Sequence, residues 1–422
     1  MRIGVMTAFS GMVEHYSLTS VVLDQIEMIR LGGHTPVLIA LEDFNWAEAP
    51  ADLEIRPYLP FFHKIDYTSV RDLTTDHQQV VADAERAMLR ACPDLDCVFT
   101  HDLMFTGWNA PLALAVGLAA QQMTVPWFHW VHSVPSGRRD YWVLPPRSKL
   151  IYPNYCDRIR CAESFGTWNE SVLVVPHCKD PRRFLLTTPL AKKIITEYDV
   201  LGADIIQTLP VAIDRIDHKG FDQIVGVFSG LKKLGKSVRL IVCNAWCNVD
   251  KHRQKVQQLK KICREQGLFD SEVIWTSLVD DCKHELGVTQ EEVRDLMLVS
   301  NLFIYPTKSE TFGLVVAEAA MTGQLLVLNA SLPMMQEIAG HGNALYFHFG
   351  SHQQTANNSN WNAYYQDVAK IIVHRMEADE SLRAKTWFRQ KYRMEAIWGQ
   401  LEGAILADRM KALEPVEAEL VG

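Results

Sequence analysis

Two glutamates, Glu310 and Glu318, stand in settings where carboxylates can bind the hydroxyl groups of a ligand. Glu310 lies in a polar loop after the apolar run Leu302–Tyr305, and Glu318 lies inside the predicted helix Leu314–Met321. A loop that begins a helix at the carboxyl end of a parallel strand presents free backbone N–H groups and a partial positive charge, which favour phosphate. Residues eight positions apart on one helix are about 80° apart around its axis, so these carboxylates are not an adjacent acid/base pair. We expect them to bind hydroxyls at different places along one ligand, as a sugar nucleotide would require.

The elements that position these side chains surround them directly in the sequence. Leu302–Tyr305 is short and aromatic-rich, as is typical of a buried parallel strand, and Pro306 ends it. Gly323 ends the predicted helix, and a second apolar strand follows at 325–328. Glu337 lies shortly after that strand, and we expect it to contact the nucleotide.

The segment PTKSETFGLVVAEA resembles the E-x7-E signature of the family 4 retaining glycosyltransferases of GT-B fold, with Glu310 and Glu318 as its two acids. This resemblance implies an α/β chain of two Rossmann-like, doubly wound domains that face a cleft. It also implies that Glu310 and the backbone of Phe312, Gly313 and Leu314 hold the donor sugar, and that Glu318 binds the ribose. The alternative is a buried helix that carries two incidental acids.

Two cations near the start of the second half, Arg215 and Lys219, lie in a segment that resembles the G-R-x4-K-G motif of the same family. The resemblance gives them the catalytic role of holding the donor diphosphate as it leaves. Losing one fixed charge of this kind costs on the order of 10²- to 10³-fold in rate. The sequence departs from the motif twice, because Asp214 replaces the usual glycine and three residues, not four, separate the two cations. The alternative is a surface pair at helical spacing.

The first half begins with a β-α-β pattern and carries a pair of histidines. A dinucleotide-binding fold would have G-x-G-x-x-G in the first loop, and the presence of Gly11 alone disfavours an NAD enzyme. Gly11 is either a simple turn residue or a point where the backbone approaches the donor or the acceptor. His129 and His132 lie at the end of a predicted strand, where an imidazole can bind a sugar hydroxyl. The family usually has a histidine at this strand end near the donor sugar, and either one matches it, with a structural role left for the other.

A basic and aromatic stretch bears on the acceptor. The segment HWVHSVPSGRR is similar to the histidine-bearing strand end of phage DNA alpha-glucosyltransferases. Residues 138–183 then contain nine basic residues against five acids, with aromatic residues between them. Basic groups with stacking aromatics suit an anionic acceptor, including nucleic acid, and a solvated surface is the alternative. Farther on, VLVVPHCKDPRRF resembles the family's turn before the linker, with His177 and Cys178 in place of its Asn-Gly.

The length of 422 residues suits two domains. We expect an acceptor-side domain at 1–185, a nucleotide-sugar-binding domain at 201–385, and a C-terminal helical segment at 386–422 that returns to the first domain. Trp387, Tyr392 and Trp398 are the expected anchors of that segment.

The composition favours a cytoplasmic protein, or one of the host cytoplasm if a phage encodes it. Met1 leads directly into a predicted strand, without a signal peptide, and no apolar run is long enough to cross a bilayer. The nine cysteines show no metal-ligand pattern, and their odd number predicts reduced thiols. The formal net charge of −8 disfavours a dedicated nucleic-acid binder. Asp94 and Asp96 form a D-x-D pattern before a strand, at the end away from any site, so no metal is expected.

These observations predict a retaining hexosyltransferase that moves a hexose, with glucose favoured, from a nucleotide-diphosphate sugar to a hydroxyl acceptor. UDP-glucose is the favoured donor, and no cofactor is required. A small molecule or a glycan is the default acceptor, and hydroxymethylated pyrimidine bases of DNA are the alternative. A non-catalytic nucleotide-binding protein of GT-B fold is a further alternative, which the presence of all four charged motif residues disfavours.

Overall fold

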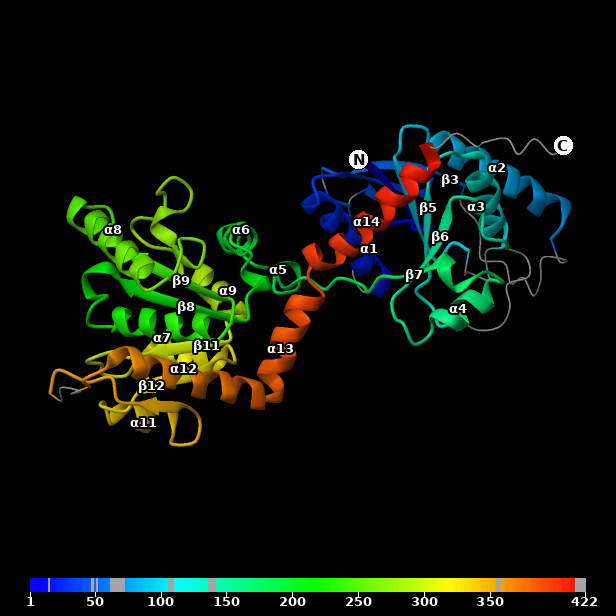
Figure 1. The fold of residues 1–422 in the computed structure, drawn as a ribbon. Coiled ribbons are helices and arrows are strands. Elements are labelled where there is room, and N and C mark those ends of the chain that lie inside the picture. The colour runs from blue at the N-terminus through cyan, green and yellow to red at the C-terminus, as the bar shows by residue number, and fades with distance from the viewer. Residues whose placement is uncertain are drawn as a thin grey trace. The chain divides into compact units, whose positions relative to one another are not determined.

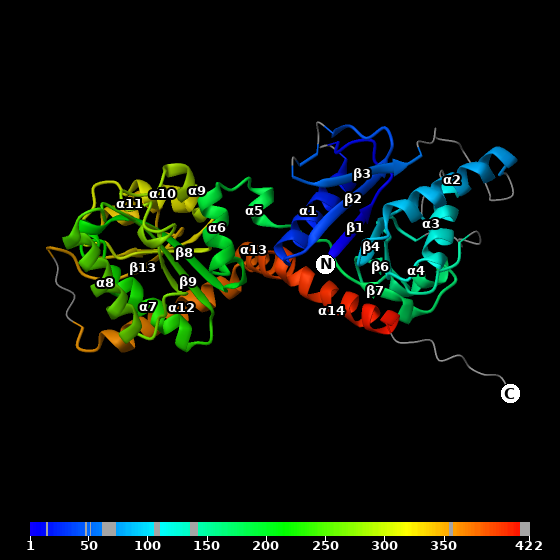
Figure 2. The ribbon, with the colours of Figure 1, turned by 90° about the horizontal axis from the view of Figure 1, so that it is seen from above.

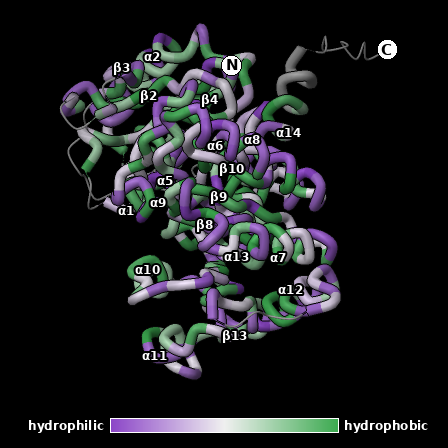
Figure 3. Tube along the Cα trace, turned by 90° about the vertical axis from the view of Figure 1, so that its left-hand side faces the viewer, coloured by the Kyte–Doolittle hydropathy of each residue, from purple (hydrophilic) through white to green (hydrophobic). Residues whose placement is uncertain are grey.

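Short apolar runs form parallel strands, and the amphipathic segments between them form helices, in two units of the chain. The computed structural model describes residues 1–13, 16–46, 49–50, 52–60, 73–104, 110–135, 142–353 and 358–413. The first unit comprises Met1–Lys179 together with Tyr392–Gly422, and the second comprises Asp180–Lys391 (Figure 1). Hydrophobic and hydrophilic residues are interspersed along the helices, as expected where one face covers a sheet (Figure 3). None of the helices in these described ranges is long and apolar enough to cross a membrane.

The first unit is built on one parallel sheet of seven strands in the order β3-β2-β1-β4-β5-β6-β7. The strands are β1 (Arg2–Met6), β2 (Thr35–Leu41), β3 (Glu54–Leu59), β4 (Cys97–His101), β5 (Trp127–Trp130), β6 (Ser148–Tyr152) and β7 (Val172–Val174). The helices are α1 (Ser17–Leu31), α2 (Thr75–Ala91), α3 (Ala110–Gln122), α4 (Arg158–Ser164) and α14 (Met394–Leu413). The order of connection reverses between β1 and β4, and ligands of such sheets bind at the carboxyl ends of strands at this point.

Helices cover both faces of this sheet. α1 and α14 pack on one face and α2 and α3 on the other (Figure 2). Trp398 of α14 is only 6% exposed and lies in the core with α1, and Tyr392 packs against the same core. Trp387, by contrast, lies in the second unit and is 57% exposed, so it does not anchor α14.

The second unit contains two three-stranded parallel sheets, in the orders β10-β9-β8 and β11-β12-β13. The strands are β8 (Ile205–Ala212), β9 (Val238–Ala245), β10 (Val273–Trp275), β11 (Leu302–Tyr305), β12 (Leu325–Asn329) and β13 (Leu345–Phe347). The helices are α5 (Pro181–Phe184), α6 (Pro189–Glu197), α7 (Phe221–Lys233), α8 (Asp250–Glu265), α9 (Gln290–Val299), α10 (Leu314–Met321), α11 (Met334–Ala339), α12 (Trp361–Ala378) and α13 (Glu380–Lys391). α7, α8 and α12 pack on one side of the strands, and α6, α9, α10 and α11 on the other. The α/β class with parallel sheets is therefore confirmed, as are the predicted strand Leu302–Tyr305 and helix Leu314–Met321.

The segment expected to be a linker, 185–201, contains α6. Leu190, Ala191, Ile194 and Ile195 are buried on one side of this helix and pack in a core with β8 and β9. The amphipathic spacing of these residues makes α6 part of the second unit, whose first residue is Asp180.

Side-chain amides join β8 to β11 where the two sheets meet. The Gln207 side chain donates to the carbonyl of Ile304 and accepts from the Ile304 N–H, each at 2.9 Å. Asn301 accepts from the Ile206 N–H at 2.9 Å through its side chain and donates to the Ile206 carbonyl at 3.0 Å through its backbone. Because both amides are buried, these bonds hold the amino-terminal part of β8 beside β11.

The loops that follow β8 and β11 touch at Gly220. This residue has φ of 72°, and a Cβ atom there would lie 2.7 Å from the Pro306 carbonyl oxygen. Only glycine accepts both this backbone conformation and this close approach. The backbone N–H of Lys308 also donates to the His218 carbonyl at 2.8 Å, so the two loops are joined on both sides of Lys219.

The Gly220→Ala variant should lose more stability than the Gly235→Ala variant, which is its matched control. Gly235 has φ of 81° but no heavy atom within 4 Å of its added Cβ, so it has the backbone strain without the clash. Strain alone costs about 1–2 kcal/mol. Denaturant unfolding should show a further loss of about 1–3 kcal/mol for Gly220→Ala, from overpacking. Equal losses would mean that the contact with Pro306 is not tight.

Candidate functional site

A cavity of about 560 Å³ opens at the carboxyl ends of β8 and β11 in the second unit. Both predicted cations, Arg215 and Lys219, line it. So do Glu310 and the start of α10, contributed by the loop after β11. Its full lining is Pro210, Val211, Ala212, Asp214, Arg215, Lys219, Trp246, Tyr305, Glu310, Thr311, Phe312, Gly313, Leu314 and Val315. Cations and a helix start therefore meet in one space, although they come from segments about ninety residues apart in the chain.

Lys219, Tyr305 and Glu310 form a hydrogen-bonded triangle in this cavity. The Lys219 Nζ lies 2.7 Å from Glu310 Oε2 and 2.7 Å from the Tyr305 hydroxyl, which donates to the same Glu310 oxygen at 2.8 Å. Burial alone would raise the pKa of Glu310, but the bonds from Lys219, the Thr311 N–H and Tyr305 outweigh it and lower that pKa. Burial and the neighbouring Glu310 raise the pKa of Tyr305, which therefore stays protonated. The triangle holds a charged lysine and a charged glutamate in fixed positions at neutral pH.

Helix α10 begins at the wall of the same cavity. Its N-cap residue, Gly313, has φ of 77° and gives no side-chain hydrogen bond to the first turn. The first backbone N–H groups of the helix are therefore available to an anion, and the helix dipole adds to their attraction.

Arg215 lies in a short 3-10 turn, Ile213–Arg215, directly after β8. Its side chain is exposed, and no carboxylate within the described ranges forms an ion pair with it. Unlike Lys219, this guanidinium can therefore bind an incoming anion without giving up an internal partner. Asp214, which stands in place of the motif glycine, is also exposed and lines the cavity.

Glu318 lines a different cavity, of about 550 Å³, between α9 and α10. Glu310 and Glu318 thus line separate cavities, whereas the sequence analysis expects both to bind one ligand. Glu337 is exposed in the first turn of α11 and is not among the residues that line either cavity.

Two residues of the cavity escaped the sequence analysis. Tyr305 was identified only as the last residue of a strand, although a hydroxyl directly before Pro306 was a signal that it faces the site. Trp246 follows β9, is 56% exposed and has φ of 65°, a strained backbone conformation for a tryptophan. Cys247 beside it is buried, so hydrophobicity along the sequence does not indicate which of the two neighbours is exposed.

The predicted histidines lie in the first unit, at the carboxyl edge of its sheet. His129 is fully buried, its Nδ1 lies 2.9 Å from the Thr100 hydroxyl, and burial lowers its pKa to about 3. His132 is partly exposed, and its Nε2 lies 2.9 Å from His101 Nδ1. Gly11 is buried in the loop after β1 of the same unit.

The basic stretch uses several of its charges on internal contacts. Arg182 is 5% exposed and binds Asp180, with Nε 2.7 Å from Oδ1. Arg158 donates to the carbonyls of Asn169 and Val172. Arg138, Arg139 and Tyr141 lie outside the described residues. The described part of this stretch therefore offers fewer open cations to nucleic acid than its composition suggested.

The Asp94 and Asp96 pair precedes β4, at the amino end of the strand. Asp94 forms ion pairs with Arg2 and Arg56, and Asp96 accepts the Arg2 backbone N–H at 2.7 Å. These contacts give the two aspartates a structural role at the edge opposite the carboxyl ends.

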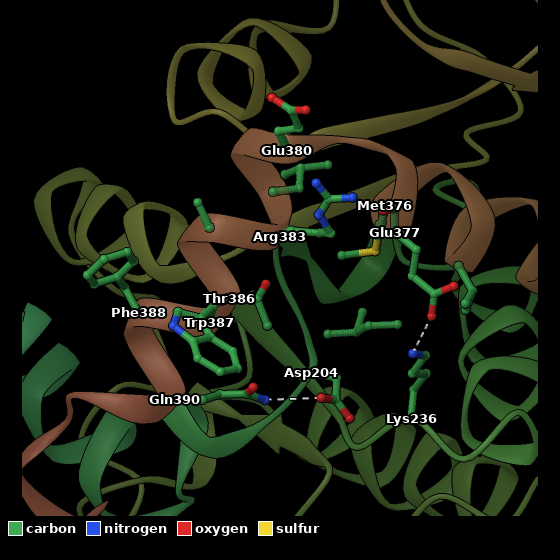
Figure 4. Close-up of a pocket in the computed structure, with 14 residues that line it drawn as sticks. Asp204, Lys236, Met376, Glu377, Glu380, Arg383, Thr386, Trp387, Phe388 and Gln390 are labelled. Atoms are coloured by element: carbon green, nitrogen blue, oxygen red, sulfur yellow. Dashed lines mark hydrogen bonds and ion pairs between the residues drawn. The ribbon is translucent and has the colours of Figure 1, made fainter. Parts of the chain in front are cut away.

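A third cavity of the second unit, of about 570 Å³, lies where α12 meets α13 and is mostly apolar (Figure 4). Four of its polar groups are paired with one another, Lys236 with Glu377 and Asp204 with Gln390, as the dashed lines in Figure 4 show. Its chemistry gives no reason to place a charged ligand there.

Comparison with known proteins agrees with the geometry of the second unit. Residues 209–370 match the family model described as glycosyl transferases group 1. The matched residues all lie in the second unit. The matched range includes both cations and both glutamates of the predicted motifs.

Individual relatives are distant. Mannosylfructose-phosphate synthase of Agrobacterium fabrum (strain C58 / ATCC 33970) is 23% identical over 186 residues, which span 44% of this chain and 38% of that protein. Anabaena Alr3699/HepE in complex with UDP-glucose is 14% identical, with a TM-score of 0.33 over 96% of this chain and 100% of that chain. Sucrose-phosphate synthase (tll1590) from Thermosynechococcus elongatus is 14% identical, with a TM-score of 0.32 over 96% and 100%.

Replacing Tyr305 by Phe should destabilise the protein by about 0.5–1.5 kcal/mol near pH 7, because a hydrogen bond to the Glu310 carboxylate is lost. Glu310 has a lowered pKa in the folded protein, so its contribution is present above the unfolded pKa and is lost as pH falls through the folded value. The deficit of the variant should therefore shrink in denaturant unfolding as the pH falls below about 4.3, the value of an unfolded glutamate. Tyr346→Phe is the control, because the Tyr346 hydroxyl donates to a neutral acceptor, the Gly340 carbonyl, at 2.6 Å. If the loss in free energy of unfolding were independent of pH in Tyr305→Phe, as it should be in Tyr346→Phe, the hydrogen bond between Tyr305 and the Glu310 carboxylate would be contradicted.

The buried histidines should make stability fall with decreasing pH below about 6.5. The folded-state pKa of His129 is lowered by burial, so between its unfolded and folded pKa values the unfolded chain binds more protons. This costs up to about 1.4 kcal/mol per pH unit for each such histidine. Denaturant unfolding at several pH values gives the slope of the free energy of unfolding against pH, which reports the number of protons taken up on unfolding. In the His129→Asn variant this number should be smaller by close to one. A slope in His129→Asn equal to that of the wild type would contradict the buried, neutral state of His129.

Proposed function

We propose that this protein is a glycosyltransferase that takes a sugar from a nucleotide-diphosphate donor, with the diphosphate bound in the cavity at the carboxyl ends of β8 and β11. The observation that carries the proposal is the meeting of Arg215, Lys219 and the start of α10 at Gly313 in one cavity. Two cations and a helix N-terminus are what a departing diphosphate requires for its stabilisation. The group 1 match over residues 209–370 supports the same reaction class.

The remaining roles are proposed from the resemblance of the two motifs to those of the family 4 glycosyltransferases. Glu310 and the backbone of Phe312, Gly313 and Leu314 bind the donor sugar, and Glu318 on the far side of α10 binds the ribose. When the donor binds, Lys219 must weaken its bond to Glu310 in order to bind the diphosphate. We further propose that the donor is UDP-glucose, that the anomeric configuration is retained, and that Glu337, Gly11 and either His132 or His129 take part in donor binding.

The acceptor is proposed to be a hydroxyl group of a small molecule or a glycan. A DNA acceptor is less well supported, because Arg182 and Arg158 of the basic stretch bind internal partners. A purely nucleotide-binding role is also less well supported, since the cavity keeps Lys219 and Glu310 in contact, an arrangement that binding alone does not need. The sequence composition supports a cytoplasmic site of action.

Donor binding tests the proposal. UDP or UDP-glucose at a free concentration 100 times its Kd should raise the free energy of unfolding by about 2.7 kcal/mol, measured as a thermal shift. Arg215→Met and Lys219→Met should weaken that shift and lower donor hydrolysis on the order of 10²-fold or more.

Lys255→Met is the matched control for these variants. Lys255 forms an ion pair at 2.7 Å with Asp217, which lies between the two cations in the sequence. Lys255 itself does not line the cavity. It should bind and hydrolyse donor like the wild type. Absence of any shift with UDP, GDP, ADP or their sugars, or an equal loss in all three variants, would contradict the proposal.

A further inference from the structure

Trp246 lies on the wall of the cavity at the carboxyl ends of β8 and β11, in a position that folding alone does not favour. It follows β9 directly, its side chain is 56% exposed, and its backbone φ is 65°. A residue with a Cβ atom is strained in this left-handed conformation, which glycine adopts freely. An exposed indole also gains little of the burial that would offset such strain. Strained residues of this kind gather at binding sites, so a ligand is the expected partner of this indole.

The backbone around Trp246 is held on both sides while its side chain stays open. The Trp246 carbonyl bonds to Nδ1 of His252, and the N–H of the next residue, Cys247, donates to the Glu285 carbonyl at 2.6 Å. Cys247 itself is only 2% exposed. In the part of the chain that the structure describes, no other aromatic ring contacts the Trp246 indole. The backbone therefore fixes where the indole begins, and its surface is available to a ligand.

Trp246 and Glu310 reach this cavity from strands on opposite sides of β8. β9 pairs with β8 along the whole length of both strands. Buried amide hydrogen bonds join β11 to the other edge of β8. Arg215 and Lys219 follow β8 itself, between these two neighbours. A ligand whose diphosphate lies at the two cations is therefore within reach of an aromatic ring from one side and a carboxylate from the other.

These two groups suit different surfaces of a sugar ring. A pyranose in its chair form has a flat face of C–H groups and a rim of hydroxyls. The negative face of an indole attracts C–H groups and gains from covering their apolar surface. Oε1 of Glu310 accepts one hydrogen bond in the described structure, from the Thr311 N–H at 2.9 Å, and keeps a lone pair for a hydroxyl. The indole thus matches the face of the ring, and the carboxylate matches its rim.

The nucleobase is the other flat ring of a nucleotide sugar, and the proposed role of Glu318 determines where it lies. That role is binding of the ribose, and Glu318 lines the separate cavity between α9 and α10. The base is attached to the ribose at the end away from the diphosphate, so it leaves the cavity of Trp246 with the ribose. The sugar is then the ring that remains beside Trp246.

We propose that Trp246 stacks on the C–H face of the donor sugar, a hexose in its pyranose form. The inference rests on the proposed function, because the sugar lies here only if Arg215, Lys219 and the start of α10 hold the diphosphate. The contact adds affinity that the nucleotide sugar has and the free nucleotide lacks. It also orients the ring with its hydroxyl rim toward Glu310.

Three variants separate this contact from a structural role. Trp246→Phe keeps a smaller ring, Trp246→Ala removes the ring, and Trp387→Ala is the matched control. Trp387 is 57% exposed in the same unit, but it lines the apolar cavity where α12 meets α13. Because more than half of Trp246 is exposed, both Trp246 variants should unfold at the denaturant concentration of the wild type. A change in binding then reports the lost contact and not a lost fold.

Calorimetric affinities for three pairs of ligands give the first readout: UDP and UDP-glucose, GDP and GDP-mannose, and ADP and ADP-glucose. For the pair that binds, Trp246→Ala should weaken the nucleotide sugar about three- to tenfold and leave the nucleotide unchanged. Trp246→Phe should lose less, and Trp387→Ala should lose nothing. Equal weakening of the nucleotide and its sugar would place the nucleobase on the indole and overturn the proposal. Wild-type affinities in Trp246→Ala would also overturn it.

Fluorine NMR of protein labelled with 5-fluorotryptophan gives a readout that does not depend on turnover. The signal that is missing from Trp246→Phe belongs to Trp246, and the nucleotide sugar should shift it more than the nucleotide does. A signal that the bound nucleotide sugar leaves unmoved would overturn this inference alone, with nucleotide binding intact. If the wild type binds none of the nucleotides, the proposed function fails, and this inference fails with it.

Discussion

The contact between the loops after β8 and β11 is the constraint on which the site of the second unit depends. Gly220 meets the Pro306 carbonyl so closely that no Cβ fits between them. The Gln207 and Asn301 amides hold the two strands side by side below this contact. Lys219 is carried with Gly220 to within 2.7 Å of Glu310, and α10 begins four residues after that carboxylate. A looser junction would leave the same charged residues present but unable to act on one ligand.

The charges in this cavity are arranged asymmetrically. Glu310 forms an ion pair with Lys219, and the phenol of Tyr305 holds both groups in place. Arg215 has no such partner within the described ranges and extends from a short turn into solvent. One cation is thus rigid and paired while the other is open. Around them Phe312, Leu314 and Trp246 are exposed apolar groups, which can cover a bound ligand and exclude water from the charged centre.

The two units both consist of parallel strands, but they differ in the charges at the carboxyl ends of those strands. In both, polar side chains gather at the carboxyl ends of parallel strands, where backbone and loops are free to meet a ligand. In the second unit the group is ionic, with two cations and a helix start. In the first, burial lowers the pKa values of His101 and His132 and keeps these imidazoles uncharged, and the Asp102 carboxyl beside them accepts the His132 N–H. The two edges therefore differ in their cations, which are present in the second unit's cavity.

The sequence by itself determined the local parts of this protein. It placed the strand Leu302–Tyr305, the helix Leu314–Met321, and the two cations and two glutamates, because each depends on neighbours within a few residues. Only the tertiary structure decided which of these residues share a cavity, and it separated Glu318 from Glu310. It also revealed Tyr305 as a partner of Lys219, and Gln25 as a partner of His101, 76 residues away in the chain. Such contacts depend on which strands lie next to one another, and no spacing along the chain encodes that order.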